Sequence, residues 1–221
     1  MRRTINPFVE DIIRRGILKT PSIIEAFKSV DRANFVREKA LAYIDEPLSI
    51  GEGQTISQPT TVAFMLELLQ PEAGNKVFEI GFGSGWQTAI LAYIVSQNGI
   101  QKSKIKNQNL GKVYAVERIK ELFEWGTTNI AKYNFIKKGI VEVICGDATK
   151  GLAEHAPYDR IIAAAAGASV PESWLKELKV GGRLVTPVGG SIWLYIKRSR
   201  DKFDKKEYKG FLFVSLISDE S

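Results

Sequence analysis

Three alternating glycines follow a short apolar run, residues 77–80. Gly81, Gly83 and Gly85 give a G-x-G-x-G spacing, and a helix-forming segment comes next. Glycines allow positive φ and let a ligand approach bare backbone, while the first N–H groups of a helix lack partners in the chain. The spacing is one residue tighter than the dinucleotide fingerprint and Glu79 precedes it, so the pattern favours S-adenosylmethionine over NAD. A turn required by packing alone is the alternative interpretation.

Two further strand-like runs end in an acidic residue. The first, 112–117, ends in Glu117. In a doubly wound nucleotide-binding fold, an acid at this strand end accepts hydrogen bonds from a ribose diol, whereas the alternative is a charge that stabilises the next helix. The second, 141–147, ends in Asp147, a candidate for the adenine end of a cofactor or for an N-cap. Carboxyl ends of parallel strands meet at one edge of a sheet, so the three motifs predict one crevice.

Composition is typical of a compact enzyme. The 221 residues, 44% of them hydrophobic, suit a single α/β domain. No apolar run reaches transmembrane length and residues 1–7 are not followed by a secretion-type apolar segment, so we expect a cytoplasmic protein with no membrane association. Cys145, the single cysteine, lies in an apolar run and should be a buried, inert thiol. His155, the single histidine, lies in a polar connection, so no metal site and no nucleophile–histidine pair is indicated.

The formal net charge of +6 raises the question of nucleic acid. The positive residues are scattered, and their densest groups lie in stretches expected to be loops, 102–106 and 197–209. A solvated surface is the expected role of such runs, with attraction to acidic peptide segments as a second option. We therefore expect that the protein does not bind nucleic acid. We also expect a monomer.

Periodicity orders the chain into an N-terminal helical cap and a sheet domain. The cap, residues 1–58, includes a loop for substrate or cofactor, and 59–221 form the sheet domain with a surface insertion at 97–111. Helices are predicted over 8–15, 21–30, 59–69, 86–93 and 171–180, and strands over 77–80, 112–117, 141–147, 159–166, 183–188, 192–196 and 211–217. Only Gly189 and Gly190 separate two of these strands, so they must pair as a hairpin. The predicted fold is a doubly wound, Rossmann-like α/β methyltransferase fold, with a mostly parallel seven-stranded sheet that ends in an antiparallel meander.

Longer stretches of the chain resemble the protein-L-isoaspartate O-methyltransferase family. They run nearly end to end, at 24–27, 31–36, 42–48, 50–59, 79–85, 116–118, 146–147 and 178–189. The segment 50–59 (Ile-Gly-Glu-Gly-Gln-Thr-Ile-Ser-Gln-Pro) is the most specific, because general methyltransferases lack it. The resemblance implies methyl transfer from S-adenosylmethionine to the α-carboxylate of L-isoaspartyl residues in damaged proteins, with S-adenosylhomocysteine as product. Proteins and peptides with such residues would be its partners.

The resemblance also implies roles for individual residues. Ser57 takes the position of the family's active-site serine, although a serine two residues before Pro59 could instead be a helix N-cap. The cofactor-binding positions are Gln54, Gly81, Gly83, Gly85, Glu117, Arg118, Asp147 and Ala148. A carboxylate substrate is already ionised at neutral pH, so the reaction needs no strong general base and no metal.

Several positions depart from the family pattern. They are Phe82, Thr60, Ala148 and Ser215, together with a missing glutamine before the strand of Trp193 and the 97–111 insertion. A relative that methylates another peptide carboxylate is therefore an alternative, as are an RNA methyltransferase and a non-catalytic peptide-binding module. The run 163–167 has no polar side chain to hold a base amine, and with 214–216 it is a candidate for holding a peptide backbone.

Overall fold

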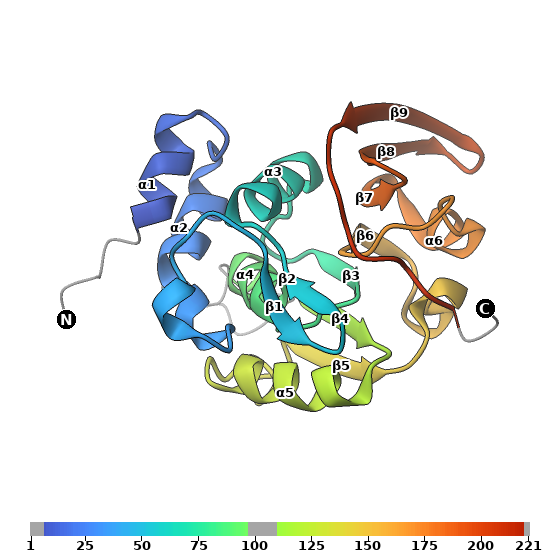
Figure 1. The fold of residues 1–221 in the computed structure, drawn as a ribbon. Coiled ribbons are helices and arrows are strands. Elements are labelled where there is room, and N and C mark those ends of the chain that lie inside the picture. Colours follow the sequence, from blue (N-terminus) through green and yellow to red (C-terminus); the bar gives the residue numbers. More distant parts are fainter. Residues whose placement is uncertain (1–6, 97–109, 219–221) are drawn as a thin grey trace, which may run out of the picture.

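A seven-stranded sheet forms the centre of the molecule in the computed structural model, which describes residues 7–96 and 110–218 (Figure 1). Its strands are β3 (Lys76–Ile80), β4 (Lys112–Glu117), β5 (Val141–Cys145), β6 (Tyr158–Ala163), β7 (Leu178–Val188), β8 (Ser191–Ser199) and β9 (Lys202–Lys209). They lie in the order β5-β4-β3-β6-β7-β8-β9. Pairing is parallel from β5 to β7 and antiparallel from β7 to β9. The predicted doubly wound sheet with a terminal meander is confirmed.

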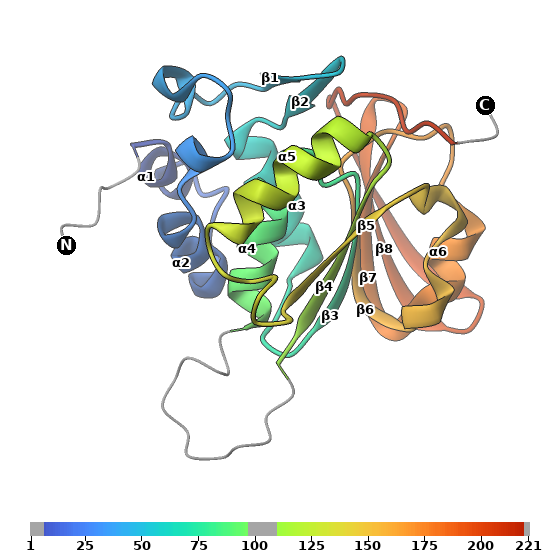
Figure 2. The ribbon, with the colours of Figure 1, turned by 90° about the horizontal axis from the view of Figure 1, so that it is seen from below.

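Helices cover both faces of this sheet. They are α1 (Pro7–Arg14), α2 (Pro21–Ser29), α3 (Pro59–Leu69), α4 (Trp86–Val95), α5 (Lys120–Ala131) and α6 (Glu172–Glu177). Figure 2 shows α3, α4 and α5 on one face and α6 on the other. Side chains alternate along β3, so buried Val77 packs with the first group of helices while buried Phe78 packs with Trp174 of α6.

A small hairpin lies above the carboxyl end of the sheet (Figure 2). Its strands, β1 (Leu48–Gly51) and β2 (Gln54–Ile56), pair antiparallel and do not join the main sheet. α3 begins three residues after β2, at the predicted Pro59, because proline suits the first helical turn. The stretch 48–59 thus connects the N-terminal helices to the edge where the parallel strands end.

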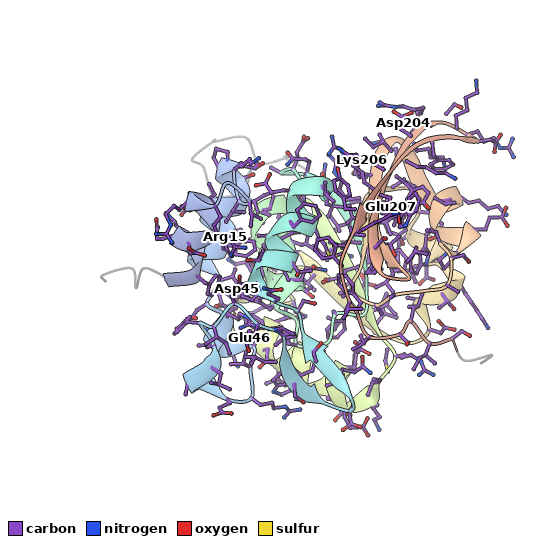
Figure 3. The ribbon with its side chains drawn as sticks, turned by 45° about the horizontal axis from the view of Figure 1, so that its top comes forward. Arg15, Asp45, Glu46, Asp204, Lys206 and Glu207 are labelled. Atoms are coloured by element: carbon purple, nitrogen blue, oxygen red, sulfur yellow. The ribbon has the colours of Figure 1, made fainter. Side chains whose placement is uncertain are left out.

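The last strand was wrongly predicted. The apolar run 211–217 does not close the sheet, since Ser215 makes only an isolated bridge to Ala166. The seventh strand is instead β9, in a stretch expected to be a loop because it carries so many charges. β9 is an edge strand, where exposed lysines suit solvent and discourage pairing with another chain (Figure 3 labels Asp204, Lys206 and Glu207).

Smaller predictions are also corrected. Cys145 is exposed rather than buried, because β5 is the other edge strand and the cysteine ends it. The helix expected over 171–180 is shorter, and its last predicted residues belong to β7. The 97–111 insertion and the basic run 102–106 lie outside the described residues, apart from Leu110 and Gly111. Over the described ranges, no helix combines the length and apolar character that crossing a membrane requires.

Candidate active site

The glycine turn between β3 and α4 has the conformation that its spacing predicts. Gly81, Gly83 and Gly85 have φ values of +74°, +50° and +83°, which residues with a Cβ rarely adopt. A Cβ on Gly81 would meet no heavy atom within 4 Å, so its backbone is open to a ligand. A Cβ on Gly85 would lie 2.6 Å from Cγ1 of Ile130, so that glycine is required by packing against α5. Gly81 therefore fits a ligand-binding turn, while Gly85 fits a turn that packing requires.

A cavity of about 670 Å³ opens beside this turn, at the carboxyl ends of β3, β4 and β5. Seven of the residues predicted to bind a cofactor line it: Gln54, Gly81, Gly83, Glu117, Arg118, Asp147 and Ala148. Gly85 does not line it and packs instead against Ile130 of α5. Sequence reasoning missed the apolar walls, formed by Ile50, Ile80, Val116, Ile119, Leu122 and Ile217. Those at strand ends and at the start of α5 could have been found from their places beside the acidic residues.

Glu117 ends β4 with its side chain 6% exposed. Its Oε2 accepts a hydrogen bond from the Gly83 N–H (2.9 Å), and its Oε1 accepts one from the N–H of Ile119 (3.0 Å), the residue before α5. The carboxylate thus fixes the glycine turn and the start of the helix together. Each oxygen of an ionised carboxylate can accept a second hydrogen bond, so capacity remains for a ligand in the cavity.

Asp147 follows the end of β5. It caps a short helical turn, which was the alternative to its predicted role in cofactor binding. It is the N-cap of a short 3₁₀ turn, Ala148–Lys150, and its Oδ1 accepts from the Thr149 N–H (2.8 Å) and hydroxyl (2.7 Å). Ala148 is 7% exposed, and its carbonyl accepts from Nε1 of Trp174 (2.8 Å). Both residues also line the cavity, so this rim is rigidly held.

Ser57 lines an adjoining cavity of about 360 Å³. Thr55, Gly81, Gly83 and Ala164 line both cavities, so the two lie side by side. Ser57 is not the N-cap of α3, which corrects that alternative: Gln58 occupies the cap position and makes no side-chain cap bond. Within the part of the chain that the structure describes, no hydrogen bond reaches the Ser57 hydroxyl.

Glu79 is the principal polar residue whose place in the site the sequence did not reveal. It lies on β3, wholly buried, and lines the smaller cavity. Its Oε1 accepts from Nε2 of Gln87 (3.1 Å), and Oε2 has no hydrogen-bond partner among the described residues. Burial raises the pKa of Glu79 to about 7, the Glu117 charge adds to this, and the nearby side chains of Thr88 and Gln87 oppose it. The signal was present, since an acid inside an apolar strand run is costly to bury.

The C-terminal segment 211–217 borders the large cavity. The Ala166 N–H donates to the Val214 carbonyl (2.8 Å), and the Leu216 N–H donates to the Ala166 carbonyl (2.8 Å). The N–H groups of Ala166 and Leu216 are used within the chain, so these two donors are not free to hold a peptide in the way the sequence suggested. Ala165 and Ser215, which lie beside them, line the cavity.

Two departures from the family pattern, Phe82 and Thr60, make specific contacts in the structure. Phe82 packs beside Phe123, with ring centres 6.0 Å apart, and lines the smaller cavity. The Thr60 hydroxyl and N–H both donate hydrogen bonds to the Asp45 carboxylate.

His155 stacks on Tyr114, with ring centres 4.1 Å apart, and does not line either cavity. Among the described residues no group of three or more histidine, cysteine, aspartate or glutamate side chains could hold a metal ion.

Comparison with known proteins identifies the family of this chain. The family model described as protein-L-isoaspartate(D-aspartate) O-methyltransferase matches residues 3–221. The chain belongs to this family. A relative from Staphylothermus marinus is 50% identical over 218 residues, covering 96% of this chain and 93% of its own, and one from Methanopyrus kandleri is 40% identical over 225 residues, covering 99% and 93%. Both are named protein-L-isoaspartate O-methyltransferase.

A solved structure shares the fold of this family member. It is a protein-L-isoaspartate O-methyltransferase from Plasmodium falciparum in complex with S-adenosyl-L-homocysteine. The TM-score is 0.84 at 24% identity, and the match covers 97% of this chain and 98% of that one. The whole architecture, cap included, is therefore common to both.

Proposed function

We propose that this protein transfers the methyl group of S-adenosylmethionine to the α-carboxylate of L-isoaspartyl residues in damaged proteins, as a step in their repair. One observation carries the proposal. Two adjoining cavities place the glycine turn and Glu117 next to residues of the segment 54–57, in a chain that belongs to the isoaspartate methyltransferase family. S-adenosylhomocysteine is the expected second product.

The residues of the large cavity fit the cofactor. The open backbone at Gly81 accepts close approach, and Glu117 has acceptor capacity for the ribose hydroxyls. Asp147, Ala148 and the apolar wall suit the adenine end, while Gln54 and Arg118 border the same space. When bound, S-adenosylmethionine supplies a methyl group on a positively charged sulfur.

The chemistry that remains for the protein is alignment. The substrate carboxylate is ionised at pH 7, and the Ser57 hydroxyl donates a hydrogen bond that orients it. As the carboxylate oxygen bonds to the methyl carbon, the carbon–sulfur bond breaks and its electrons remain on sulfur, so both charges disappear. Alignment of this kind lowers barriers by up to about 7–11 kcal/mol in favourable intramolecular cases. The methyl ester is expected to cyclise to a succinimide, which allows repair.

A peptide substrate is expected to lie in extended form beside Ala165 and Ser215. Both residues line the large cavity and neither uses the backbone bonds that join Ala166 to the C-terminal segment. We also propose that the protein works as a cytoplasmic monomer without nucleic acid. The single cysteine and the scattered, mixed-sign surface charges support this part of the proposal.

The cofactor assignment is tested by Glu117→Ala. This variant should bind S-adenosylmethionine about 10- to 100-fold more weakly, because a hydrogen bond to a charged group contributes about 1.5–3 kcal/mol. Isothermal titration calorimetry measures the affinity. Glu142→Ala is the matched control, since that carboxylate pairs with Lys112 and does not line the site. Unchanged affinity in Glu117→Ala would remove the assignment of the cavity.

The substrate assignment is tested with two peptides that differ only in one L-isoaspartyl or L-aspartyl linkage. With labelled S-adenosylmethionine, only the isoaspartyl peptide should be methylated. The isoaspartyl linkage places the α-carboxylate on a shorter arm, and a displacement of about 1 Å from in-line geometry costs on the order of 100-fold in rate. Equal labelling of both would indicate a different carboxyl methyltransferase. Labelling of RNA instead, or of nothing, would overturn the substrate class or the activity.

A further inference from the structure

Arg32 is a buried cation at the back of the site. It begins a 3₁₀ turn, Arg32–Asn34, and is 0% exposed. Burial lowers the pKa of its guanidinium to about 10, with the nearby Asp45 charge opposing the shift, so it remains charged at neutral pH. Within the described part of the chain no carboxylate lies within ion-pair distance of it.

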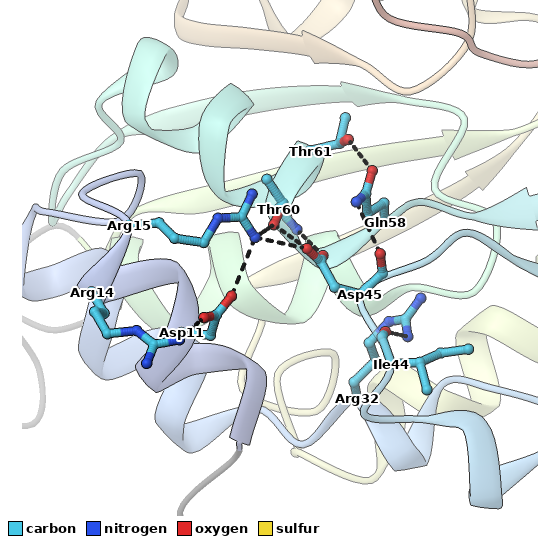
Figure 4. Close-up of polar contacts among 9 residues, drawn as sticks. All are labelled: Asp11, Arg14, Arg15, Arg32, Ile44, Asp45, Gln58, Thr60 and Thr61. Carbon is cyan, nitrogen blue, oxygen red and sulfur yellow. Dashed lines mark hydrogen bonds and ion pairs between the residues drawn. The ribbon is translucent and has the colours of Figure 1, made fainter.

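The partners of Arg32 are four backbone carbonyls. Nη1 donates to the carbonyls of Ala42 (3.0 Å) and Ile44 (3.3 Å). Nη2 donates to those of Glu46 (3.0 Å) and Ser57 (3.2 Å). One planar group thus joins the loop 42–46 to the backbone of the proposed catalytic serine, and Figure 4 shows the guanidinium beside this loop.

Other contacts hold the loop 42–46 to the residues that follow Ser57. Nε2 of Gln58 donates to the Asp45 carbonyl (2.9 Å), and the Thr60 N–H donates to Oδ1 of Asp45 (2.8 Å). Arg15 at the end of α1 holds Oδ2 of the same aspartate (3.2 Å; Figure 4). The loop 42–46 is therefore fixed to the backbone at 57 and 60 and to the side chain of Gln58.

Arg32 also contacts the cofactor side of the site. Its Cζ lies 5.4 Å from the ring centre of Trp86, the first residue of α4 after the glycine turn. A cation over an indole face is attracted to it. One side chain thereby touches both the element that carries Ser57 and the element that begins at the glycine turn.

Burial of this charge is not explained by stability. Removing a cation from water is costly, and well-packed apolar residues often replace buried charges without loss. The planar guanidinium provides several N–H donors in a fixed geometry, so it can hold several carbonyls at once. The Ser57 hydroxyl has no bond of its own among the described residues, so the backbone must set its position.

We propose that Arg32 is a positioning residue, which holds the Ser57 hydroxyl at the cavity by clamping the Ser57 carbonyl to the loop 42–46. This inference rests on the proposed function, in which Ser57 orients the substrate carboxylate.

The first variant to test is Arg32→Lys. A lysine keeps the charge, but its single nitrogen cannot span all four carbonyls. Turnover should fall about 10- to 100-fold, because a shift of about 1 Å at the reacting atoms has that effect. The cofactor dissociation constant should change less than about 3-fold.

Arg160→Lys is the matched control. Arg160 is also a largely buried arginine that donates to backbone carbonyls, those of Gln70 (2.8 Å) and Asp159 (2.9 Å), near the amino end of β6 and away from the cavities. It should lose stability and keep its turnover.

A double-mutant cycle separates positioning from general structure. If Arg32 acts through Ser57, Arg32→Lys should slow the wild type strongly and the Ser57→Ala enzyme by less than about 2-fold. An equal loss in both backgrounds would overturn the inference, as would full turnover in folded Arg32→Lys. Normal turnover in Ser57→Ala alone would instead overturn the role of Ser57 in the proposed function.

Folding is followed in every variant by thermal melting. Arg32→Gln, which removes the buried charge and keeps two amide donors, repeats the cycle if Arg32→Lys does not fold. If neither variant folds at 25 °C, Arg32 is needed for the fold itself and the positioning role is rejected.

Discussion

The Ser57 hydroxyl lacks a hydrogen bond to the described residues, although it lines a cavity shared with the glycine turn. Ser57→Ala should therefore lower turnover without lowering stability. A hydrogen bond to a charged carboxylate contributes about 1.5–3 kcal/mol, which corresponds to a loss of about 10- to 100-fold in turnover. Steady-state kinetics with an isoaspartyl peptide, combined with thermal melting, measures both quantities.

Ser96→Ala is the matched control for this prediction. The Ser96 hydroxyl donates to the Tyr93 carbonyl (3.0 Å) at the far end of α4, and the residue is 3% exposed. Its loss should cost stability, about 0.5–1.5 kcal/mol, and leave turnover unchanged. A lower melting temperature with normal kinetics in Ser57→Ala would show that the serine is structural.

Glu79 predicts a pH dependence of stability. Its carboxyl has a pKa raised by burial to about 7, above the value of an unfolded chain. The stability associated with the protonated form is complete below about pH 4 and is lost as the pH rises through 7. The side chain in Glu79→Gln cannot ionise, so its contribution to stability does not change with pH. From pH 5 to pH 8 the unfolding free energy of the wild type should therefore fall relative to that of the variant, by at most about 3 kcal/mol. Urea unfolding at both pH values measures it, and parallel pH curves for the two proteins would contradict the assignment.

At the scale of elements, the sequence identified those whose pattern is local. α3 begins and ends as predicted, because Pro59 suits a first turn and Val62, Met65, Leu66 and Leu69 form one buried face. β4 is likewise predicted residue by residue. Both are covered by protein, so hydrophobic periodicity is sufficient to define them.

Elements fixed by a neighbour could not be found in this way. β9 has few apolar residues, and it is a strand because it pairs with β8. In this pairing Ser191 lies opposite Lys209. The apolar run 211–217 was predicted to be the strand instead, but its residues 214–217 line the cavity and do not join the sheet. The exposure of Cys145 has the same origin, since edge position depends on strand order and not on local sequence.

The C-terminal segment gives a prediction about its backbone. Leu212→Pro removes the N–H of a 95% exposed residue that lines neither cavity, and this N–H makes no hydrogen bond among the described residues, whereas Leu216→Pro removes the N–H that donates to the Ala166 carbonyl. Leu212→Pro should keep its kinetics. Leu216→Pro should raise the Michaelis constants for peptide and cofactor several-fold, because the wall formed by 214–217 is released from the cavity. Equal kinetics in the two variants would show that this segment does not shape the site.

At the scale of the whole molecule, the site residues were predictable because separate motifs at strand ends converge on one edge of the sheet. Glu117 and Asp147 line one cavity with Gly81, as expected. The clamp by Arg32 was not predictable, because it depends on how the N-terminal cap packs against α4. That packing is direct: Phe8 and Phe27 make edge-to-face contacts with Trp86 at 6.1 and 5.5 Å.

This shared packing predicts that the cap and the sheet domain unfold together. One core contains Ile12 and Phe27 from the cap with Trp86 and Leu91 from α4, so neither part keeps its buried surface without the other. Calorimetry should show one transition whose calorimetric and van't Hoff enthalpies agree. Phe27→Leu should lower that single transition rather than create an earlier one.

Cofactor binding should move the same transition as a unit. A ligand at 100 times its dissociation constant stabilises the folded state by about 2.7 kcal/mol, which raises the melting temperature by about 5–10 °C for a chain of this length. The cavity is built from segments between Ile50 and Ile217, so the ligand ties the cap hairpin to the sheet and the shift should include both. Glu117→Ala, at the same ligand concentration, should show a smaller shift. A separate early transition, or a shift confined to one of two transitions, would mean that residues 1–58 form an independent unit.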